Sequence, residues 1–172
     1  MKRAVFLDRD GVINRVIIKE GKPYSPRKIS DFELTDGIKE GLITLREAGF
    51  LLIVVTNQPD ISRGLITWGK LGAIHDLIRN ELPVDEIIVC PHDDVDKCDC
   101  RKPKPGMIVE SARKWGVDIG SSFIIGDTWK DMEAGYMAGC STILLDAPYN
   151  QDVESDHRIN VIADSINIIE RE

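Results

Sequence analysis

The 172-residue sequence predicts a doubly wound, Rossmann-like α/β fold, in which a parallel sheet of about five strands has helices on both faces. Short, wholly apolar runs recur along the chain, as expected for strands that are buried on both faces of a sheet. Segments with helical spacing of apolar residues separate these runs, and their lengths suit right-handed βαβ crossovers. The sequence has no internal repeat and no linker, so we expect one domain over residues 1–172.

The first predicted strand, residues 4–7, leads directly into two carboxylates, Asp8 and Asp10. Parallel sheets bind their ligands at the carboxyl ends of the strands, and Gly11 permits a tight turn at this point. Burying a carboxylate costs free energy unless a cation or hydrogen-bond donors compensate for it. The stretch therefore predicts a metal site whose other ligands come from later segments.

The next segment, residues 15–30, is polar, and we expect it to run as a loop over the carboxyl edge of the sheet. A helix is predicted over residues 37–48, ending at Gly49. Its buried stripe consists of Ile38, Leu42 and Leu45. This helix leads back to the second strand, residues 51–55, and so completes the first crossover.

The second strand ends in a polar cluster, where ligands are expected to bind: Thr56, Asn57 and Gln58. A helix over about 67–80 follows, with Thr67 as its N-cap. The third strand, residues 86–89, is short and leads into a long polar loop over residues 90–106. Loops of this length inside a compact domain are usually functional.

The remaining elements repeat the same alternation. A helix over about 106–115 precedes the fourth strand, residues 122–125, which ends at Gly126 and Asp127. A helix over 130–138 leads to the fifth strand, residues 142–145, and the tail from residue 159 is predicted to add a short strand and a helix.

Composition excludes several classes of function. The net charge of −7 argues against general nucleic-acid binding, which requires a basic face. No apolar run approaches the roughly 20 residues that span a bilayer, and the N-terminus has no signal-peptide pattern. We therefore expect a cytoplasmic protein that binds neither membrane nor nucleic acid, and that is a monomer.

The predicted sheet brings three carboxylates, a Thr-Asn pair and a lysine, Lys102, to one edge. Hard oxygen ligands in this number suit Mg²⁺, and a magnesium site with a lysine indicates phosphoryl chemistry. The sequence has no P-loop pattern, which argues against ATP hydrolysis of that type. Asp8 is able to act as a covalent nucleophile, and Asp10 as the acid and base that serve it.

The loop over residues 90–106 carries a second metal pattern. Its ligands follow the spacing Cys-x-His-x5-Cys-x-Cys, formed by Cys90, His92, Cys98 and Cys100. Three sulfurs and one nitrogen suit tetrahedral Zn²⁺, and a closed set of four ligands is typical of a structural site. Zinc would fix this polar loop and, with it, the adjoining Arg101 and Lys102.

Four motifs, in this order and spacing, resemble those of the haloacid dehalogenase superfamily of aspartate-nucleophile phosphatases. They are Asp8-Arg9-Asp10-Gly11, Thr56-Asn57-Gln58, Arg101-Lys102-Pro103 and Gly126-Asp127-x-x-x-Asp131. The resemblance covers residues 4 to about 146. It is strongest to the subgroup of heptose-1,7-bisphosphate and histidinol-phosphate phosphatases, because the zinc loop of that subgroup is also present.

The resemblance implies a role for each site residue. Asp8 is the nucleophile, Asp10 the general acid and base, and Lys102 offsets the charge of Asp8 and of the phosphoryl group. Mg²⁺ is held by Asp8, the main-chain carbonyl of Asp10, and Asp127. The phosphoryl group is bound by Thr56 and Asn57. The rest of the substrate is bound by Gln58, Arg63 and Arg101. The short inserts imply an open site with no large cap domain.

Three functions remain in competition. The leading one is the hydrolysis of a sugar phosphate, with heptose 1,7-bisphosphate favoured because Arg63, Arg101 and Lys104 suit a second phosphate. The second is histidinol-phosphate hydrolysis, for which three acidic residues of the same loop provide partners: Asp93, Asp94 and Asp96. The third, from another class, is a phospho-acceptor receiver module. A receiver places its aspartate after the third strand, where this chain has Cys90-Pro91-His92.

Overall fold

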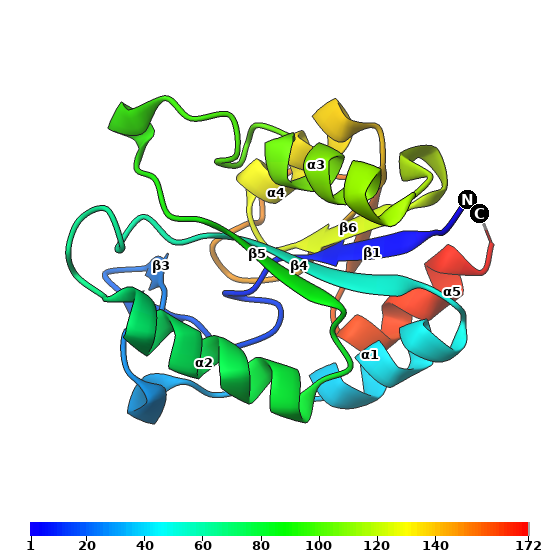
Figure 1. The fold of residues 1–172 in the computed structure, drawn as a ribbon. Coiled ribbons are helices and arrows are strands. Elements are labelled where there is room, and N and C mark those ends of the chain that lie inside the picture. The colour runs from blue at the N-terminus through cyan, green and yellow to red at the C-terminus, as the bar shows by residue number, and fades with distance from the viewer. Residues whose placement is uncertain (172) are drawn as a thin grey trace.

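The computed structural model describes residues 1–171, and it confirms the predicted α/β class (Figure 1). Within these residues, a parallel sheet of six strands has the order β5-β4-β1-β6-β7-β8. The strands are β1 (Ala4–Leu7), β4 (Leu51–Asn57), β5 (Glu86–Cys90), β6 (Phe123–Gly126), β7 (Ser141–Leu145) and β8 (His157–Ile159). The strand order reverses on either side of β1, so the polar ends of β4 and β6 flank the residues that follow β1.

Helices cover both faces of the sheet. Figure 1 shows α3 and α4 on one face, and α1, α2 and α5 on the other. The helices are α1 (Ile38–Glu47), α2 (Trp68–Glu81), α3 (Gly106–Trp115), α4 (Trp129–Ala138) and α5 (Ser165–Ile169). Residue 172, the end of the predicted C-terminal helix, lies outside the described residues.

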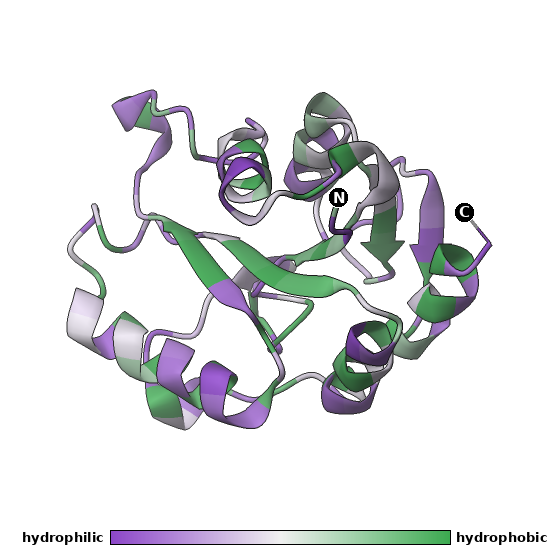
Figure 2. Cartoon of the chain, turned by 45° about the vertical axis from the view of Figure 1, so that its right-hand side comes forward, coloured by the Kyte–Doolittle hydropathy of each residue, from purple (hydrophilic) through white to green (hydrophobic). Residues whose placement is uncertain are grey.

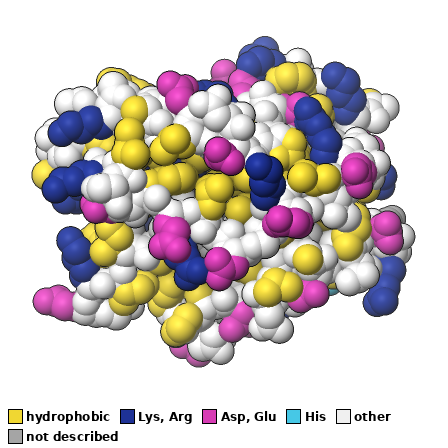
Figure 3. Space-filling model, turned by 90° about the horizontal axis from the view of Figure 1, so that it is seen from below, with side chains coloured by type: hydrophobic (Ala, Val, Ile, Leu, Met, Phe, Trp, Pro, Cys, Tyr) yellow, Lys and Arg dark blue, Asp and Glu magenta, His cyan; other side chains and the backbone are white. Residues whose placement is uncertain are grey.

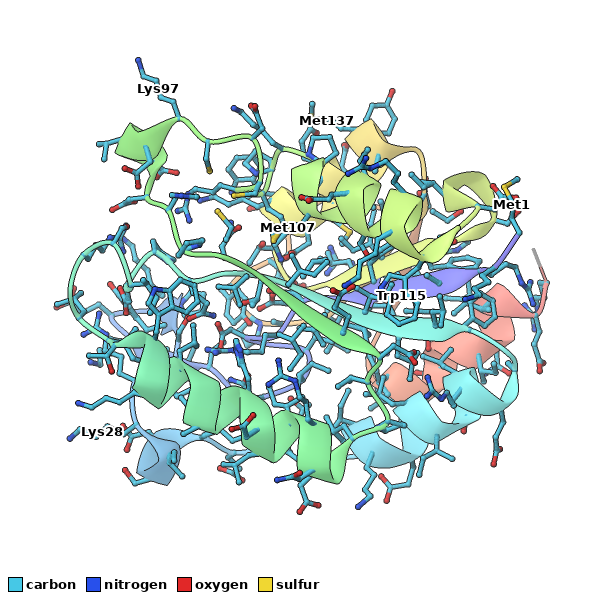
Figure 4. All side chains as sticks on the ribbon, viewed as in Figure 1. Met1, Lys28, Lys97, Met107, Trp115 and Met137 are labelled. Atoms are coloured by element: carbon cyan, nitrogen blue, oxygen red, sulfur yellow. The ribbon has the colours of Figure 1, made fainter. Side chains whose placement is uncertain are left out.

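Each strand contributes to two cores because alternate side chains point to opposite faces. In β1, Val5 and Leu7 join the core beneath α1 and α5, whereas Ala4 and Phe6 join the core beneath α3. Figure 2 shows the apolar strands enclosed between helices of mixed character, and Figure 4 shows Met107 of α3 directed at the sheet. Burial on both faces explains the wholly apolar strand sequences.

Three helix boundaries have clear physical causes, and the first of them, the Thr67 N-cap, was predicted. The hydroxyl of Thr67 accepts a hydrogen bond from the Lys70 N–H at the start of α2. Gly116, with φ of +68°, ends α3 in the left-handed conformation that glycine adopts without a Cβ penalty. At the start of α4, Thr128 and Asp131 form a capping box.

Two of the fold predictions were incomplete. Residues 15–30 are not a simple loop, because they contain the antiparallel hairpin of β2 (Ile17–Lys19) and β3 (Lys22–Tyr24). Both strands carry charged or exposed residues, so they lack the apolar pattern that marks the buried strands. The count of about five strands was also incomplete, because the short strand predicted for the tail, β8, joins the edge of the sheet as a sixth.

The hairpin is the whole of the regular insert between β1 and α1, apart from a short 3₁₀ turn, and residues 1–171 contain no large cap domain. The surface seen in Figure 3 mixes acidic and basic side chains with scattered apolar ones. In the described part of the chain, no helix has both the length and the apolar character needed to span a membrane.

The packing of α1 gives a stability prediction. Leu42 is fully buried against the sheet, whereas its neighbour Ile43 is 40% exposed. We expect Leu42→Ala to lower the free energy of unfolding by about 2–5 kcal/mol, through lost burial and the cavity left behind. Ile43→Ala is the matched control and should change it by less than about 0.5 kcal/mol. Urea unfolding of both variants measures this, and equal losses would contradict the assigned inner face.

Candidate active site

The carboxyl ends of β1, β4 and β6 meet at a pocket of about 190 Å³. The predicted residues that line this pocket are Asp8, Asp10, Asn57, Arg101, Lys102 and Asp127. The hairpin closes one side of the pocket with Pro23 and Tyr24 of β3, and with Ser25 directly after it. The structure thus gathers side chains that the sequence spreads over more than a hundred residues.

Asp8 follows β1 directly, and its N–H donates to the Ile125 carbonyl of β6 at 2.9 Å. Its Oδ1 accepts two hydrogen bonds of 2.8 Å, from the Arg9 N–H and from Nζ of Lys102. Burial raises the pKa of Asp8 to about 7, and the negative charge of Asp131 adds to this rise, while Lys102 opposes it. The carboxylate therefore needs nearby positive charge to stay ionised.

Lys102 supplies part of that charge from a buried position. Its Nζ donates to Asp8 Oδ1 at 2.8 Å, to the Val55 carbonyl at 2.8 Å and to Asp131 Oδ1 at 2.5 Å. Burial alone would lower the pKa of Lys102, but the charges of Asp131 and Asp8 outweigh it and raise the pKa above its ordinary value. The ammonium group is thus fixed between two carboxylates.

Two side chains position Lys102. Asn57 makes two hydrogen bonds to its main chain: Nδ2 of Asn57 donates to the Lys102 carbonyl at 2.9 Å, and Oδ1 accepts from the Lys102 N–H at 3.0 Å. Asp131 holds the ammonium, and its other oxygen accepts from the N–H and hydroxyl of Thr128. A Cβ on Gly126 would lie 2.2 Å from the Cβ of Asp131, so this close approach requires glycine.

Asp127 presents one oxygen with no partner. Among the described residues, its buried Oδ1 has no hydrogen-bond donor. Oδ2 accepts a hydrogen bond from the Tyr149 hydroxyl, and the main-chain carbonyl accepts one from Asn150 Nδ2. Burial raises the pKa of Asp127 well above its ordinary value, and the charge of Asp8 adds to this. A buried carboxylate oxygen without a donor is the arrangement that a cation would complete.

A divalent cation fits these residues. Carboxylate oxygens of Asp8, Asp127 and Asp131 lie within 4.8 Å of one another. Asp131 already uses both oxygens on protein donors, which leaves Asp8 and Asp127 as the carboxylates able to hold the ion. A Cβ on Gly11 would lie 1.9 Å from Asp127 Oδ2, so the turn after β1 needs glycine for this contact.

Asp10 is held by donors on both oxygens. Its Oδ1 accepts from Arg9, at 3.1 Å from Nε and 2.7 Å from Nη2, and from Asn14 Nδ2 at 3.0 Å. Its Oδ2 accepts from Ser25 Oγ at 2.7 Å and from Gln58 Nε2 at 2.8 Å. Burial would raise the pKa of Asp10, but the positive charge of Arg9 and these hydrogen bonds outweigh it and lower the pKa.

The sequence analysis did not assign Arg9 a role. Its side chain is completely buried, and besides Asp10 it contacts His75 of α2, with 3.2 Å between Nη1 and Nε2. Burial lowers the pKa of His75 to about 4, and the charge of Arg9 contributes. His75 is therefore neutral near pH 7, and its Nε2 accepts the hydrogen bond. No motif links the two residues, which are 66 positions apart.

Thr56 and Gln58 lie behind the pocket rather than in its lining. Both are buried, and Gln58 Nε2 bridges Asp10 Oδ2 and Thr56 Oγ1. This geometry gives Gln58 a part in orienting Asp10. Its predicted contact with substrate, and that of Thr56 with the phosphoryl group, stay predictions.

The four predicted zinc ligands form one cluster. Their ligand atoms lie within 4.8 Å of one another in the described structure: Cys90, His92, Cys98 and Cys100. The Sγ atoms of Cys90, Cys98 and Cys100 are 3.0–3.6 Å apart, and His92 Nδ1 is 3.3 Å from Cys100 Sγ. Zinc with bonds of about 2.0–2.3 Å gives edges of roughly 3.5–3.8 Å, close to these separations. The residues fit tetrahedral Zn²⁺.

The loop also orders its basic residues by ion pairs. Arg101 lines the pocket, and it donates to Asp94 at 2.7 Å and to the His92 carbonyl at 3.2 Å. Arg63 is exposed and pairs with Asp93 at 2.5 Å, outside the lining of the pocket. Arg101 therefore lies at the pocket and Arg63 does not, and a substrate contact of either residue stays a prediction. A further cation that was not predicted, Lys130, lines the pocket.

Relatives and solved structures identify the family of this chain. A HAD-hydrolase-like family model matches residues 99–167. A D-glycero-β-D-manno-heptose-1,7-bisphosphate 7-phosphatase of Photorhabdus laumondii is 35% identical, over 95% of this chain and 90% of the relative. A D-glycero-α-D-manno-heptose-1,7-bisphosphate 7-phosphatase of Campylobacter jejuni is 37% identical, over 83% of this chain and 81% of the relative.

A heptose bisphosphate phosphatase from B. bronchiseptica, solved with magnesium and phosphate, superposes with a TM-score of 0.85. It is 29% identical, and the match covers 99% of both chains. The chain belongs to the haloacid dehalogenase-like phosphatases. As a member of this family it is a hydrolase, and the receiver alternative is not supported.

The buried His75 gives a pH prediction for this haloacid dehalogenase-like phosphatase. Its folded pKa, about 4, lies below the unfolded value of 6.5. The unfolded state therefore binds more protons between these values, so stability is complete above pH 6.5 and falls as the pH drops toward 4. His75→Gln lacks this titration. Between pH 7 and pH 4.5, we expect wild type to lose roughly 2–3 kcal/mol more stability than the variant, measured by urea unfolding. Equal losses would contradict a buried neutral histidine.

Proposed function

We propose that this phosphatase hydrolyses a small sugar phosphate through an aspartyl-phosphate on Asp8, and that its substrate is D-glycero-D-manno-heptose 1,7-bisphosphate. The observation that carries the proposal is the set of groups around Asp8. A buried ammonium contacts one of its oxygens, Asp10 lines the same pocket, and so does Asp127, whose buried Oδ1 has no hydrogen-bond donor. Such a set suits transfer of a phosphoryl group to a carboxylate.

The reaction has two steps. In the first, a carboxylate oxygen of Asp8 attacks phosphorus, the bond from phosphorus to the sugar oxygen breaks, and Asp10 gives its proton to that oxygen. In the second, Asp10 takes a proton from water, the water oxygen attacks phosphorus, and the bond to Asp8 breaks. Inorganic phosphate leaves, and both carboxyl groups return to their starting states.

Mg²⁺ would be held by Asp8, the main-chain carbonyl of Asp10, and Asp127. When bound, it supplies positive charge that offsets repulsion between the nucleophile and the phosphate oxygens. The unpartnered oxygen of Asp127 supports this assignment, as does the magnesium in the structure from B. bronchiseptica. Tyr149 holds the other oxygen of Asp127, which keeps the free one directed at the site. Thr56 and Asn57 are proposed to bind the phosphoryl group, and Lys102 to neutralise it.

Zn²⁺ is proposed to occupy the cluster of Cys90, His92, Cys98 and Cys100 as a structural ion. The loop has few apolar residues, and its tip is exposed, with Lys97 directed into solvent in Figure 4. Arg101 follows the last ligand directly and donates to the carbonyl of a second, His92. The zinc site would thereby fix the cation that faces the substrate.

Two cations at the pocket favour a bisphosphate. Arg101 and Lys130 line it together with Lys102, and a second phosphate would find charge-assisted hydrogen bonds there. The three acidic residues that would suit the amine of histidinol phosphate, Asp93, Asp94 and Asp96, do not line the pocket, whereas Arg101 does. Relatives that act on either anomer match this chain at similar identity, so the anomer is a question for the assay.

The proposed function predicts a large difference in kcat/KM between two substrates. We expect phosphate release from one anomer of heptose 1,7-bisphosphate at a kcat/KM at least about tenfold above that for histidinol phosphate, a difference of about 1.4 kcal/mol. Asp8→Asn should abolish turnover of every ester, because the amide is a poor nucleophile. Asp31→Asn, at an exposed site, is the control and should retain activity. Turnover by Asp8→Asn would contradict the covalent mechanism, and faster histidinol phosphate hydrolysis would contradict the substrate.

The proposed zinc site predicts that losing the metal also lowers activity. Cys100→Ser should release zinc and lower kcat/KM on every phosphate ester by tenfold or more, because misplacing a catalytic group by about 1 Å costs up to 10²-fold. The loss should be larger for the sugar bisphosphate than for p-nitrophenyl phosphate, since Arg101 contacts only the remote part of the former. Cys140→Ala, at a buried cysteine outside the cluster, is the control. If kcat/KM is unchanged after zinc has been shown to be lost, the proposed link between the zinc loop and catalysis is wrong.

A further inference from the structure

The side chains of Arg9 and His75 form a buried pair that contacts Asp10, and the reaction steps above do not use it. We propose that His75 is a positioning residue for the general acid: it fixes the Arg9 guanidinium, which in turn fixes the Asp10 carboxyl for proton transfer to the leaving oxygen. The proposal rests on the proposed role of Asp10, and it adds a residue of α2 to the reaction.

The geometry supports this chain of contacts. Nε and Nη2 of Arg9 both donate to Oδ1 of Asp10, so the guanidinium supplies two of the five hydrogen bonds that hold the carboxyl group. The third nitrogen, Nη1, is directed to Nε2 of His75. All three nitrogens of a completely buried guanidinium are thereby accounted for by two residues. With Oδ1 held in this way, Oδ2 is the oxygen of Asp10 on the side of Ser25, which lines the pocket.

The chemistry requires an acceptor that carries no charge. A guanidinium is always protonated and only donates, so each of its groups needs an acceptor when water is excluded. A carboxylate at position 75 would compete with Asp10 for the arginine, whereas a neutral imidazole accepts without weakening that ion pair. Losing the acceptor leaves a buried donor unpaired, and the guanidinium then gains by turning away from Asp10.

The dependence of the rate on the leaving group shows whether His75 positions the general acid or only stabilises the fold. Protonation matters most when the departing oxygen is a strong base, and little when it is a stable anion such as p-nitrophenolate. Phenyl phosphate and p-nitrophenyl phosphate are similar in size and differ in this property. The ratio of their kcat/KM values reports the first step alone, up to cleavage of the ester bond, and it does not require the identity of the sugar substrate.

The experiment compares four variants on these two esters. In His75→Leu we expect kcat/KM to fall roughly tenfold on phenyl phosphate and less than about threefold on p-nitrophenyl phosphate, since general acid catalysis is worth 10²–10⁴-fold in total. His75→Gln, which offers a neutral acceptor oxygen, should restore much of the loss. Ile78→Ala is the control, since it removes buried volume from α2 and leaves Arg9 and His75 unchanged. It should change kcat/KM by the same factor for both esters.

Asp10→Asn serves as the reference. If it shows no leaving-group dependence, Asp10 is not the acid and the proposed mechanism itself fails. Suppose instead that Asp10→Asn shows this dependence. If His75→Leu then lowers kcat/KM equally for both esters, or changes it for neither, the mechanism stands and the role of His75 is overturned. Should His75→Leu not fold, the comparison of wild type with His75→Gln decides: a change in the ratio of more than about threefold for this conservative variant would contradict the acceptor role.

Discussion

The placement of one ammonium group between two buried carboxylates underlies the whole site. Parallel strands end at a common edge, and this sheet carries acidic residues at that edge after β1 and β6. Like charges at such distances destabilise one another in a low dielectric. Lys102 reduces this repulsion because it bonds Asp8 and Asp131 at once. The charge of Lys102 opposes the rise that burial causes in the pKa of Asp8, and the charges of Asp131 and Asp8 raise the pKa of Lys102.

The lysine that carries this ammonium group lies in a segment outside the sheet. Lys102 comes from the loop after β5, and its main chain is fastened to Asn57 at the end of β4. The loop has few apolar groups to bury, so packing alone would order it poorly. The cluster of three cysteines and a histidine lies immediately before this segment, so the proposed zinc would order it without touching any reacting atom. The ion pair of Arg63 with Asp93 braces the same loop from outside, and that of Arg101 with Asp94 lies within it.

Much of this could be read from the sequence because the signals were local. Apolar runs located the central strands, and the acids after them located the pocket, since parallel strands place their carboxyl ends together. The cluster of Cys90, His92, Cys98 and Cys100 was predicted from its spacing. The hairpin of β2 and β3 was missed because its exposed strands, with Pro23 among them, lack an apolar pattern. Contacts such as Tyr149 with Asp127, or His75 with Arg9, join distant segments, and no local pattern encodes them.

The pKa values of Asp8 and Asp10 show why the proposed mechanism depends on bound ligands. In the protein alone, burial raises the pKa of Asp8, while Arg9 and its neighbours lower that of Asp10. A nucleophile must be ionised and an acid protonated, so the protein by itself favours the reverse assignment. A divalent cation against Asp8 and Asp127 favours the ionised form of the nucleophile, and a phosphate dianion beside Asp10 favours the protonated form of the acid. The roles of the two residues are therefore set when cation and substrate bind, which restricts the reactive arrangement to the loaded enzyme.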